Sequence, residues 1–170
     1  MSDPGGVRRP HRRCRAMVVA FGRRGHGDDG VGPAVLDALG ERCTPGIELH
    51  ELRDPVRLLD LVQRTEHLVV VDSVVGSPFP PGSVFQLPCR RLSPVSVVPL
   101  SVGRPLGVFE ALQLALQTVP AAERAVISIV AIAIAASRPL RAGLSGPAER
   151  AIPDAVRLVE RLVGTRPSTP

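Results

Sequence analysis

Apolar and polar positions follow two different patterns along this chain. Continuous apolar runs of strand length, which are typical of strands buried on both faces, lie at 16–21, 67–72 and 125–136. Two shorter extended segments lie at 46–49 and 83–87. Apolar residues recur at helical spacing in four further segments, 33–39, 55–62, 107–117 and 148–163. Strands and helices therefore alternate, which predicts an α/β fold.

The connections predict how the strands are arranged. Only residues 73–82 separate the second long run from the strand at 83–87, which is too short for a crossover helix, so we expect these two strands to be antiparallel. Residues 95–100 form one more extended segment, interrupted by proline. The prediction is a three-layer αβα sandwich whose sheet is mixed, mostly parallel, and made of five or six strands.

A glycine-rich loop joins the first strand to the first helix. Its residues 25–30 (GHGDDG) fit the glycine spacing of dinucleotide-binding loops, and Glu48 and Glu51 follow about 20 residues later, where an acid would bind the ribose. However, Asp28 and Asp29 lie where such a loop holds a pyrophosphate, and carboxylates repel phosphate. We therefore expect no nucleotide cofactor.

The positions of the acids favour a cation site instead. Asp72 ends the central apolar run, and the carboxyl ends of parallel strands meet at one edge of the sheet, where α/β folds bind their ligands. The loop that carries Asp29 lies at the same edge, so the two carboxylates together predict a cation site. Each acid also has a plainer interpretation, because Asp28 or Asp29 could cap the first helix and Asp72 could cap the following turn.

Charge and composition exclude several function classes. The arginine-rich segment 1–15 holds five arginines and one aspartate, so it accounts for four of the five net positive charges. We expect this tail to be disordered, residues 16–164 to form one domain, and residues 165–170 to be flexible. Four phenylalanines without tryptophan or tyrosine argue against nucleic-acid binding through base stacking.

Two other observations concern the compartment. The longest apolar run has about a dozen residues, well below the roughly 20 that a membrane helix needs, so we expect no membrane partner. The three cysteines, Cys14, Cys43 and Cys89, show no paired spacing, which indicates a reducing compartment and argues against a disulfide framework or a thiolate zinc site. We expect a cytoplasmic protein.

Several segments together resemble one known family, the hydrogenase maturation proteases. The loop GRRGHGDDGVGPAV resembles the family loop G-N-x-x-x-x-D-D/E-G-x-G, and HLVVVDSVVGSPFPPGSV resembles its central strand, aspartate and hairpin. ELRDPVRLLD, LGVFEALQLA and GLSGPAERAIPDAV resemble its other helical segments, in the same order. The resemblance covers nearly all of the chain from Met17 to about Val163. It implies the same fold, a mixed sheet between helical layers.

The resemblance also implies roles for particular residues. Family members remove a C-terminal peptide from the large subunit of nickel–iron hydrogenase after nickel insertion, and two acids and a histidine bind the metal. The acids correspond to Asp29 and Asp72, whereas the histidine position falls on Arg104 or, with one inserted residue, on Gly103. Neither can replace an imidazole, so we expect nickel, supplied by the substrate, to bind weakly. His26 is a candidate substitute ligand, although a solvent-facing loop histidine is the plainer interpretation.

The predicted function is therefore that of a divergent hydrogenase maturation protease, acting on the hydrogenase large-subunit precursor by metal-assisted peptide hydrolysis. The family asparagine after the first loop glycine is Arg23 here, and no catalytic side chain is assigned. One alternative is a catalytically impaired relative that binds a partner protein, and another is a dinucleotide-binding domain. We expect a monomer.

Overall fold

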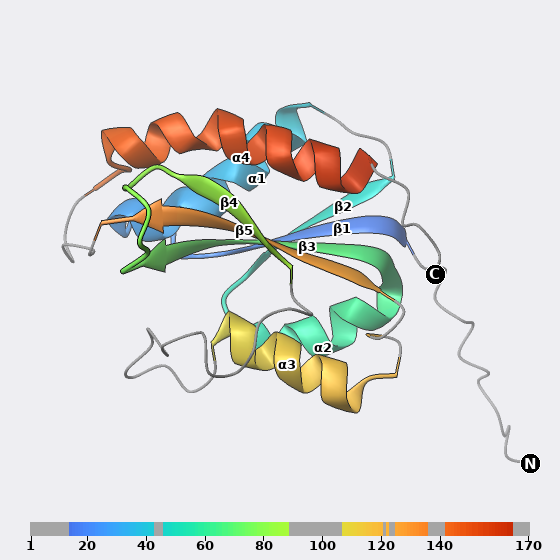
Figure 1. Ribbon diagram of the computed structural model, residues 1–170. Coiled ribbons are helices and arrows are strands. Elements are labelled where there is room, and N and C mark those ends of the chain that lie inside the picture. Colours follow the sequence, from blue (N-terminus) through green and yellow to red (C-terminus); the bar gives the residue numbers. More distant parts are fainter. Residues whose placement is uncertain are drawn as a thin grey trace, which may run out of the picture.

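The computed structural model describes residues 14–42, 46–88, 107–120, 122, 125–135 and 142–164. A sheet lies between two helical layers (Figure 1). Its strands are β1 (Cys14–Phe21), β2 (Ile47–Leu52), β3 (Thr65–Val75), β4 (Val84–Pro88) and β5 (Val126–Ile134). The α-helices are α1 (Val31–Glu41), α2 (Leu58–Leu61), α3 (Val108–Thr118) and α4 (Gly146–Gly164), and the 3₁₀ turns are η1 (Gly27–Gly30), η2 (Pro55–Arg57) and η3 (Val62–Arg64).

The sheet has the strand order β2-β1-β3-β5-β4. β1 is parallel to both β2 and β3, β3 is parallel to β5, and β4 is antiparallel to β5. Helices α1 and α4 cover one face, and α2 and α3 cover the other (Figure 1). The predicted αβα sandwich with a mixed, mostly parallel sheet is confirmed.

The central strand explains why its apolar run is continuous. Successive residues of a strand point to opposite faces of the sheet. Val69 and Val71 pack toward α1 and α4, whereas Leu68 and Val70 pack toward α2 and α3, and all four are fully buried. Each such side chain contributes about 1.5–3 kcal/mol through burial. A strand covered on both faces is therefore apolar at every position.

The pairing of β4 differs from the prediction. β4 runs antiparallel to β3 as expected, but β5 lies between them, and β4 forms its hydrogen bonds with β5. The burial of β5 gives the reason. Residues Ile127 to Ile134 of this strand are buried throughout, which suits an interior position in the sheet. β4 carries the exposed Gln86 and takes the edge.

Several element boundaries also differ from the prediction. β1 begins at Cys14, so two residues of the predicted tail 1–15 belong to the sheet. β3 continues past Asp72 to Val75 because β5 runs alongside it, and Val75 pairs with Ile134. Asp72 therefore lies inside the strand rather than at its end. The rest of the tail, the segment 95–100 and residues 165–170 lie outside the described residues.

A side-chain cap begins the connection between β2 and β3. Asp54 caps η2 by accepting a hydrogen bond from the Val56 N–H at 3.0 Å, and Pro55 occupies the first position. Among the described residues, no helix is long and apolar enough to cross a membrane.

Candidate functional site at the carboxyl edge of the sheet

The start of α1 packs directly onto the end of β1 and onto the neighbouring part of β3. A Cβ atom at Gly32 would lie 2.3 Å from the Phe21 carbonyl oxygen of β1 and 3.4 Å from the Val71 carbonyl oxygen of β3. Only glycine allows this close approach. The loop before α1, which carries Asp29, therefore lies beside the end of β1. Asp72, on the neighbouring strand β3, is level with this end of β1, since Ala20 pairs with Val71.

Asp29 is paired within its own loop. Its Oδ2 accepts a hydrogen bond from Arg23 Nε at 2.7 Å, and the side chain is 17% exposed, compared with 55% for Arg23. The Arg23 backbone N–H also donates to the Asp29 carbonyl at 3.2 Å. Gly22 has φ +135°, and a Cβ there would lie 2.0 Å from the same carbonyl. The arginine that replaces the family asparagine thus engages the predicted metal ligand.

Asp28 joins the loop to the last helix. It accepts hydrogen bonds from the Ser145 backbone N–H at 2.6 Å and from the Ser145 hydroxyl at 2.8 Å. The same hydroxyl oxygen accepts from the Ala148 N–H at 3.4 Å, in the first turn of α4. Neither Asp28 nor Asp29 caps α1, whose N-cap residue is Gly30 without a side-chain hydrogen bond. The capping interpretation of these two acids is therefore wrong.

Asp72 is partly buried and is tied to its own strand. Its Oδ1 accepts a hydrogen bond from the Ser73 N–H at 2.8 Å. Val70 packs toward α2 and α3, so Asp72, two residues further along β3, points to the same face of the sheet. That its carboxylate lies close enough to Asp29 to share a cation stays a prediction.

A third ligand is lacking in the described part of the chain. No group of three or more His, Cys, Asp and Glu side chains there could hold a metal ion. His26 is exposed, and its Nδ1 lies 3.2 Å from the Arg24 carbonyl oxygen. Gly103 and Arg104 lie outside the described residues. With Asp29 already paired to a guanidinium, the residues present fit a free metal ion poorly.

Arg24, the next residue of the loop, pairs with two acids of neighbouring elements. Its guanidinium binds Asp37 of α1 through two hydrogen bonds of 2.7 and 2.9 Å, and Glu51 of β2 at 2.8 Å. The hydrogen bond from Arg24 lowers the pKa of the Asp37 carboxyl, and the two acids raise the pKa of the guanidinium. Glu51, one of the two acids that could bind a ribose in the dinucleotide interpretation, is therefore held by a protein side chain.

His67 is an unusual buried residue that the sequence pattern did not single out. It lies near the start of β3, away from the glycine loop, and is 5% exposed. Its Nε2 is buried and has no hydrogen-bond partner among the residues that the structure describes. Burial lowers the pKa of its imidazole from 6.5. Its partners in the sheet, Ala16 of β1 and Val126 of β5, come from distant segments, so no local signal marks this burial.

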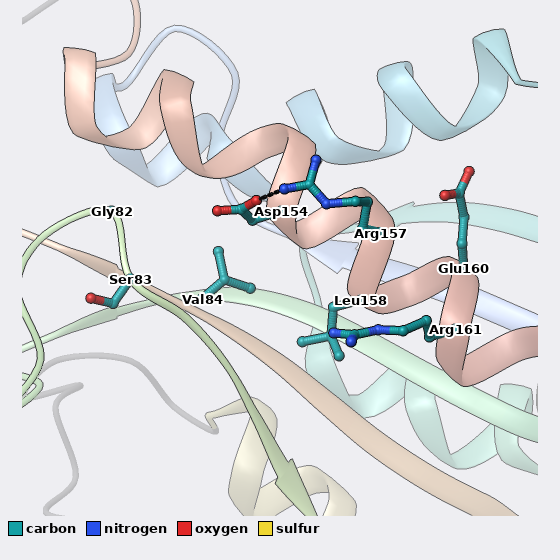
Figure 2. A pocket seen from close by; sticks show the side chains of 8 residues that line it. All are labelled: Gly82, Ser83, Val84, Asp154, Arg157, Leu158, Glu160 and Arg161. Atoms are coloured by element: carbon teal, nitrogen blue, oxygen red, sulfur yellow. Dashed lines mark hydrogen bonds and ion pairs between the residues drawn. The ribbon is translucent and has the colours of Figure 1, made fainter.

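A cavity of about 730 Å³ lies between β4 and α4 (Figure 2). Asp154 and Arg157 on its wall form an ion pair, and Glu160 accepts a hydrogen bond from Arg42 at 3.1 Å. Neither Asp29 nor Asp72 lines it. The lining residues are Gly82, Ser83, Val84, Asp154, Arg157, Leu158, Glu160 and Arg161.

No family model and no curated protein matches the sequence. Solved structures with the same architecture include several hydrogenase maturation enzymes. NiFe hydrogenase maturation protease HybD from Thermococcus kodakarensis is 21% identical, with a TM-score of 0.66 over 88% of this chain and 99% of that one. The hydrogenase maturating endopeptidase HybD from E. coli is 21% identical, with a TM-score of 0.65 over 86% and 90%. Hydrogenase 2 maturation peptidase from Thaumarchaeota archaeon SCGC_AB-539-E09 is 24% identical, with a TM-score of 0.59 over 88% and 98%. This chain therefore has the fold of the hydrogenase maturation proteases, as its sequence motifs predicted.

Proposed function

We propose that this protein is a hydrogenase maturation protease, which removes a C-terminal peptide from the nickel-loaded large subunit of a hydrogenase. One observation supports the proposal, namely that the fold matches these enzymes over most of both chains. The proposal assigns Asp29 and Asp72, the two acids that correspond to family ligands, to one shared site. The partner is the large-subunit precursor, and the protein acts as a cytoplasmic monomer.

In this proposal the chain holds nickel that the substrate brings. The carboxylates of Asp29 and Asp72 would hold this ion, which would supply Lewis-acid chemistry toward the scissile carbonyl or a water molecule. One contact positions the loop for this task, because Asp28 binds Ser145 of the segment before α4. No protein nucleophile is required.

A specific observation favours a second candidate function, that of a non-catalytic relative which binds a partner protein. The Arg23–Asp29 ion pair and the lack of a three-ligand group among the described residues both weaken a metal-dependent reaction. Such a relative would retain the sandwich and bind the precursor without cleaving it.

One experiment separates the two. The purified protein is incubated with a nickel-loaded hydrogenase large-subunit precursor, and the released peptide is followed by mass spectrometry while complex formation is followed by size-exclusion chromatography. Protease activity predicts peptide release that Asp29→Asn and Asp72→Asn abolish. Complex formation without release supports the binding module. If the precursor is neither bound nor cleaved, both candidates are wrong.

A further inference from the structure

The carboxylate assigned to the metal already has a cationic partner. Arg23 Nε lies 2.7 Å from Asp29 Oδ2, which is the length of a charge-assisted hydrogen bond. Because Asp29 is 17% exposed, water competes only partly for this oxygen. A cation that approaches Asp29 meets an ion pair instead of a free negative charge.

The backbone of the loop holds the two residues together. The Arg23 N–H donates to the Asp29 carbonyl, and the His26 N–H donates to the Arg23 carbonyl at 3.3 Å. Gly22 and Gly30 allow this closure, since a Cβ at Gly22 would lie 2.0 Å from the Asp29 carbonyl oxygen and one at Gly30 3.3 Å from the Arg23 carbonyl oxygen. The pairing partners are thus brought together by the fold, which reduces the entropy lost when their side chains pair.

We propose that Arg23 is an internal counter-ion that competes with divalent cations for Asp29, so that a cation binds this carboxylate only after the guanidinium has moved away. The assignment of Asp29 as a metal ligand rests on the proposed function, but the competition itself does not require proteolysis. Two effects act together: the ion pair must be broken, and a fixed positive charge must leave the vicinity of the incoming cation.

The neighbouring arginine provides a matched control. Arg24 carries the same charge one residue further along, but its guanidinium binds Asp37 and Glu51 rather than Asp29. Replacing either arginine with glutamine removes one positive charge from the same loop. A general effect of net charge would therefore appear in both variants, whereas competition for Asp29 would appear only at Arg23.

The test is a calorimetric titration of Ni²⁺ and Cd²⁺ into the full-length wild type, Arg23→Gln and Arg24→Gln. We expect Arg23→Gln to bind each ion about tenfold more tightly. Breaking an exposed ion pair lowers the affinity by a factor of up to about five, and the repulsion between Arg23 and the metal ion lowers it further, so the variant escapes both effects. Arg24→Gln should change affinity by less than about twofold. Arg23→Lys retains the charge and should stay close to wild type.

The gain in Arg23→Gln should disappear when Asp29→Asn is added. Circular dichroism checks that each variant is folded, and Arg23→Met serves as a second neutral variant if Arg23→Gln is not. Equal affinities for the Arg23 and Arg24 variants, or no binding by any variant, would overturn the proposal. Failure of the protein to cleave a hydrogenase precursor, with the expected titrations, would contradict the proposed function but not the competition at Asp29.

Discussion

Asp28 and Ser145, which are 117 residues apart in the chain, are joined by two hydrogen bonds, one from the Ser145 backbone N–H and one from its hydroxyl. The same serine begins α4 by accepting a hydrogen bond from the Ala148 N–H. A carboxylate at this place is also favoured by the positive end of the helix dipole. One short contact therefore couples the loop that carries Asp29 to the longest helix of the fold.

Replacement of Ser145 with alanine tests this coupling. Ser145→Ala removes the hydroxyl bond to Asp28 and the bond from Ala148, but it leaves the backbone bond in place. We expect the free energy of unfolding, measured by urea denaturation, to fall by about 1–2 kcal/mol. A double-mutant cycle with Asp28→Asn should give a coupling energy of at least about 0.5 kcal/mol. Additive effects would mean that the contact contributes little in solution.

The close packing of α1 on β1 and β3 leads to a second prediction about stability. In Gly32→Ala the new methyl group would lie 2.3 Å from the Phe21 carbonyl oxygen, which belongs to the backbone and cannot turn aside. We expect a loss of about 1–3 kcal/mol in the free energy of unfolding. Gly40→Ala, in the same helix, meets only a Leu49 methyl at 3.8 Å and should be neutral or stabilising by up to about 1 kcal/mol. Similar losses in both variants would contradict this account.

The general fold could be predicted from the sequence because its signals are local or periodic. Continuous apolar runs identify buried strands, and Asp54 followed by Pro55 identifies the start of a turn. The strand order could not be predicted, since the segment 73–82 fixes the direction of β4 but not its neighbour. The insertion of β5 depends on which strands are buried on both faces in three dimensions.

The two predicted acids both lie near the carboxyl end of β1, which the chain order of strand, loop and helix indicates, but their shared cation site stays a prediction. Their partners were not predictable. The Arg23–Asp29 pair depends on a loop closure that Gly22 allows at φ +135°, and sequence spacing does not show that the two side chains meet. The partner of Asp28 comes from the other end of the chain, and only the resemblance of the segment around Ser145 to a family motif hinted at a role there.

His67 gives a prediction about pH. Burial lowers the pKa of its imidazole below 6.5, so the unfolded chain binds a proton at a higher pH than the folded protein does. The contribution of the neutral His67 to the free energy of unfolding is therefore fully present above about pH 6.5. It decreases as pH falls toward the folded-state pKa, by up to about 1.4 kcal/mol per pH unit.

The measurement is the free energy of unfolding of wild type and His67→Leu between pH 5 and pH 7.5. The difference between the two curves of unfolding free energy against pH gives the contribution of His67. As pH falls below about 6.5, the variant should become increasingly more stable than the wild type. At pH 7.5 the variant should be at least as stable, because it removes a buried Nε2 that has no hydrogen-bond partner in the described part of the chain. A pH-independent difference for His67→Leu would show that the group does not titrate as argued.

The last prediction concerns the histidine that the family resemblance requires and this chain lacks. The corresponding position falls on Arg104, so Arg104→His removes a cation and adds a nitrogen donor of the kind that nickel prefers. We expect tighter binding of Ni²⁺ and Cd²⁺ by calorimetry, and the gain should be lost when Asp29 or Asp72 is replaced by alanine. Gly103→His tests the alignment with one inserted residue, and only one of the two histidine variants should bind more tightly. If the wild type already binds nickel tightly and His26→Ala abolishes that binding, the loop histidine is the third ligand. In that case the site would not lack a nitrogen ligand, because the imidazole of His26 would take the place of the histidine that is missing at position 104.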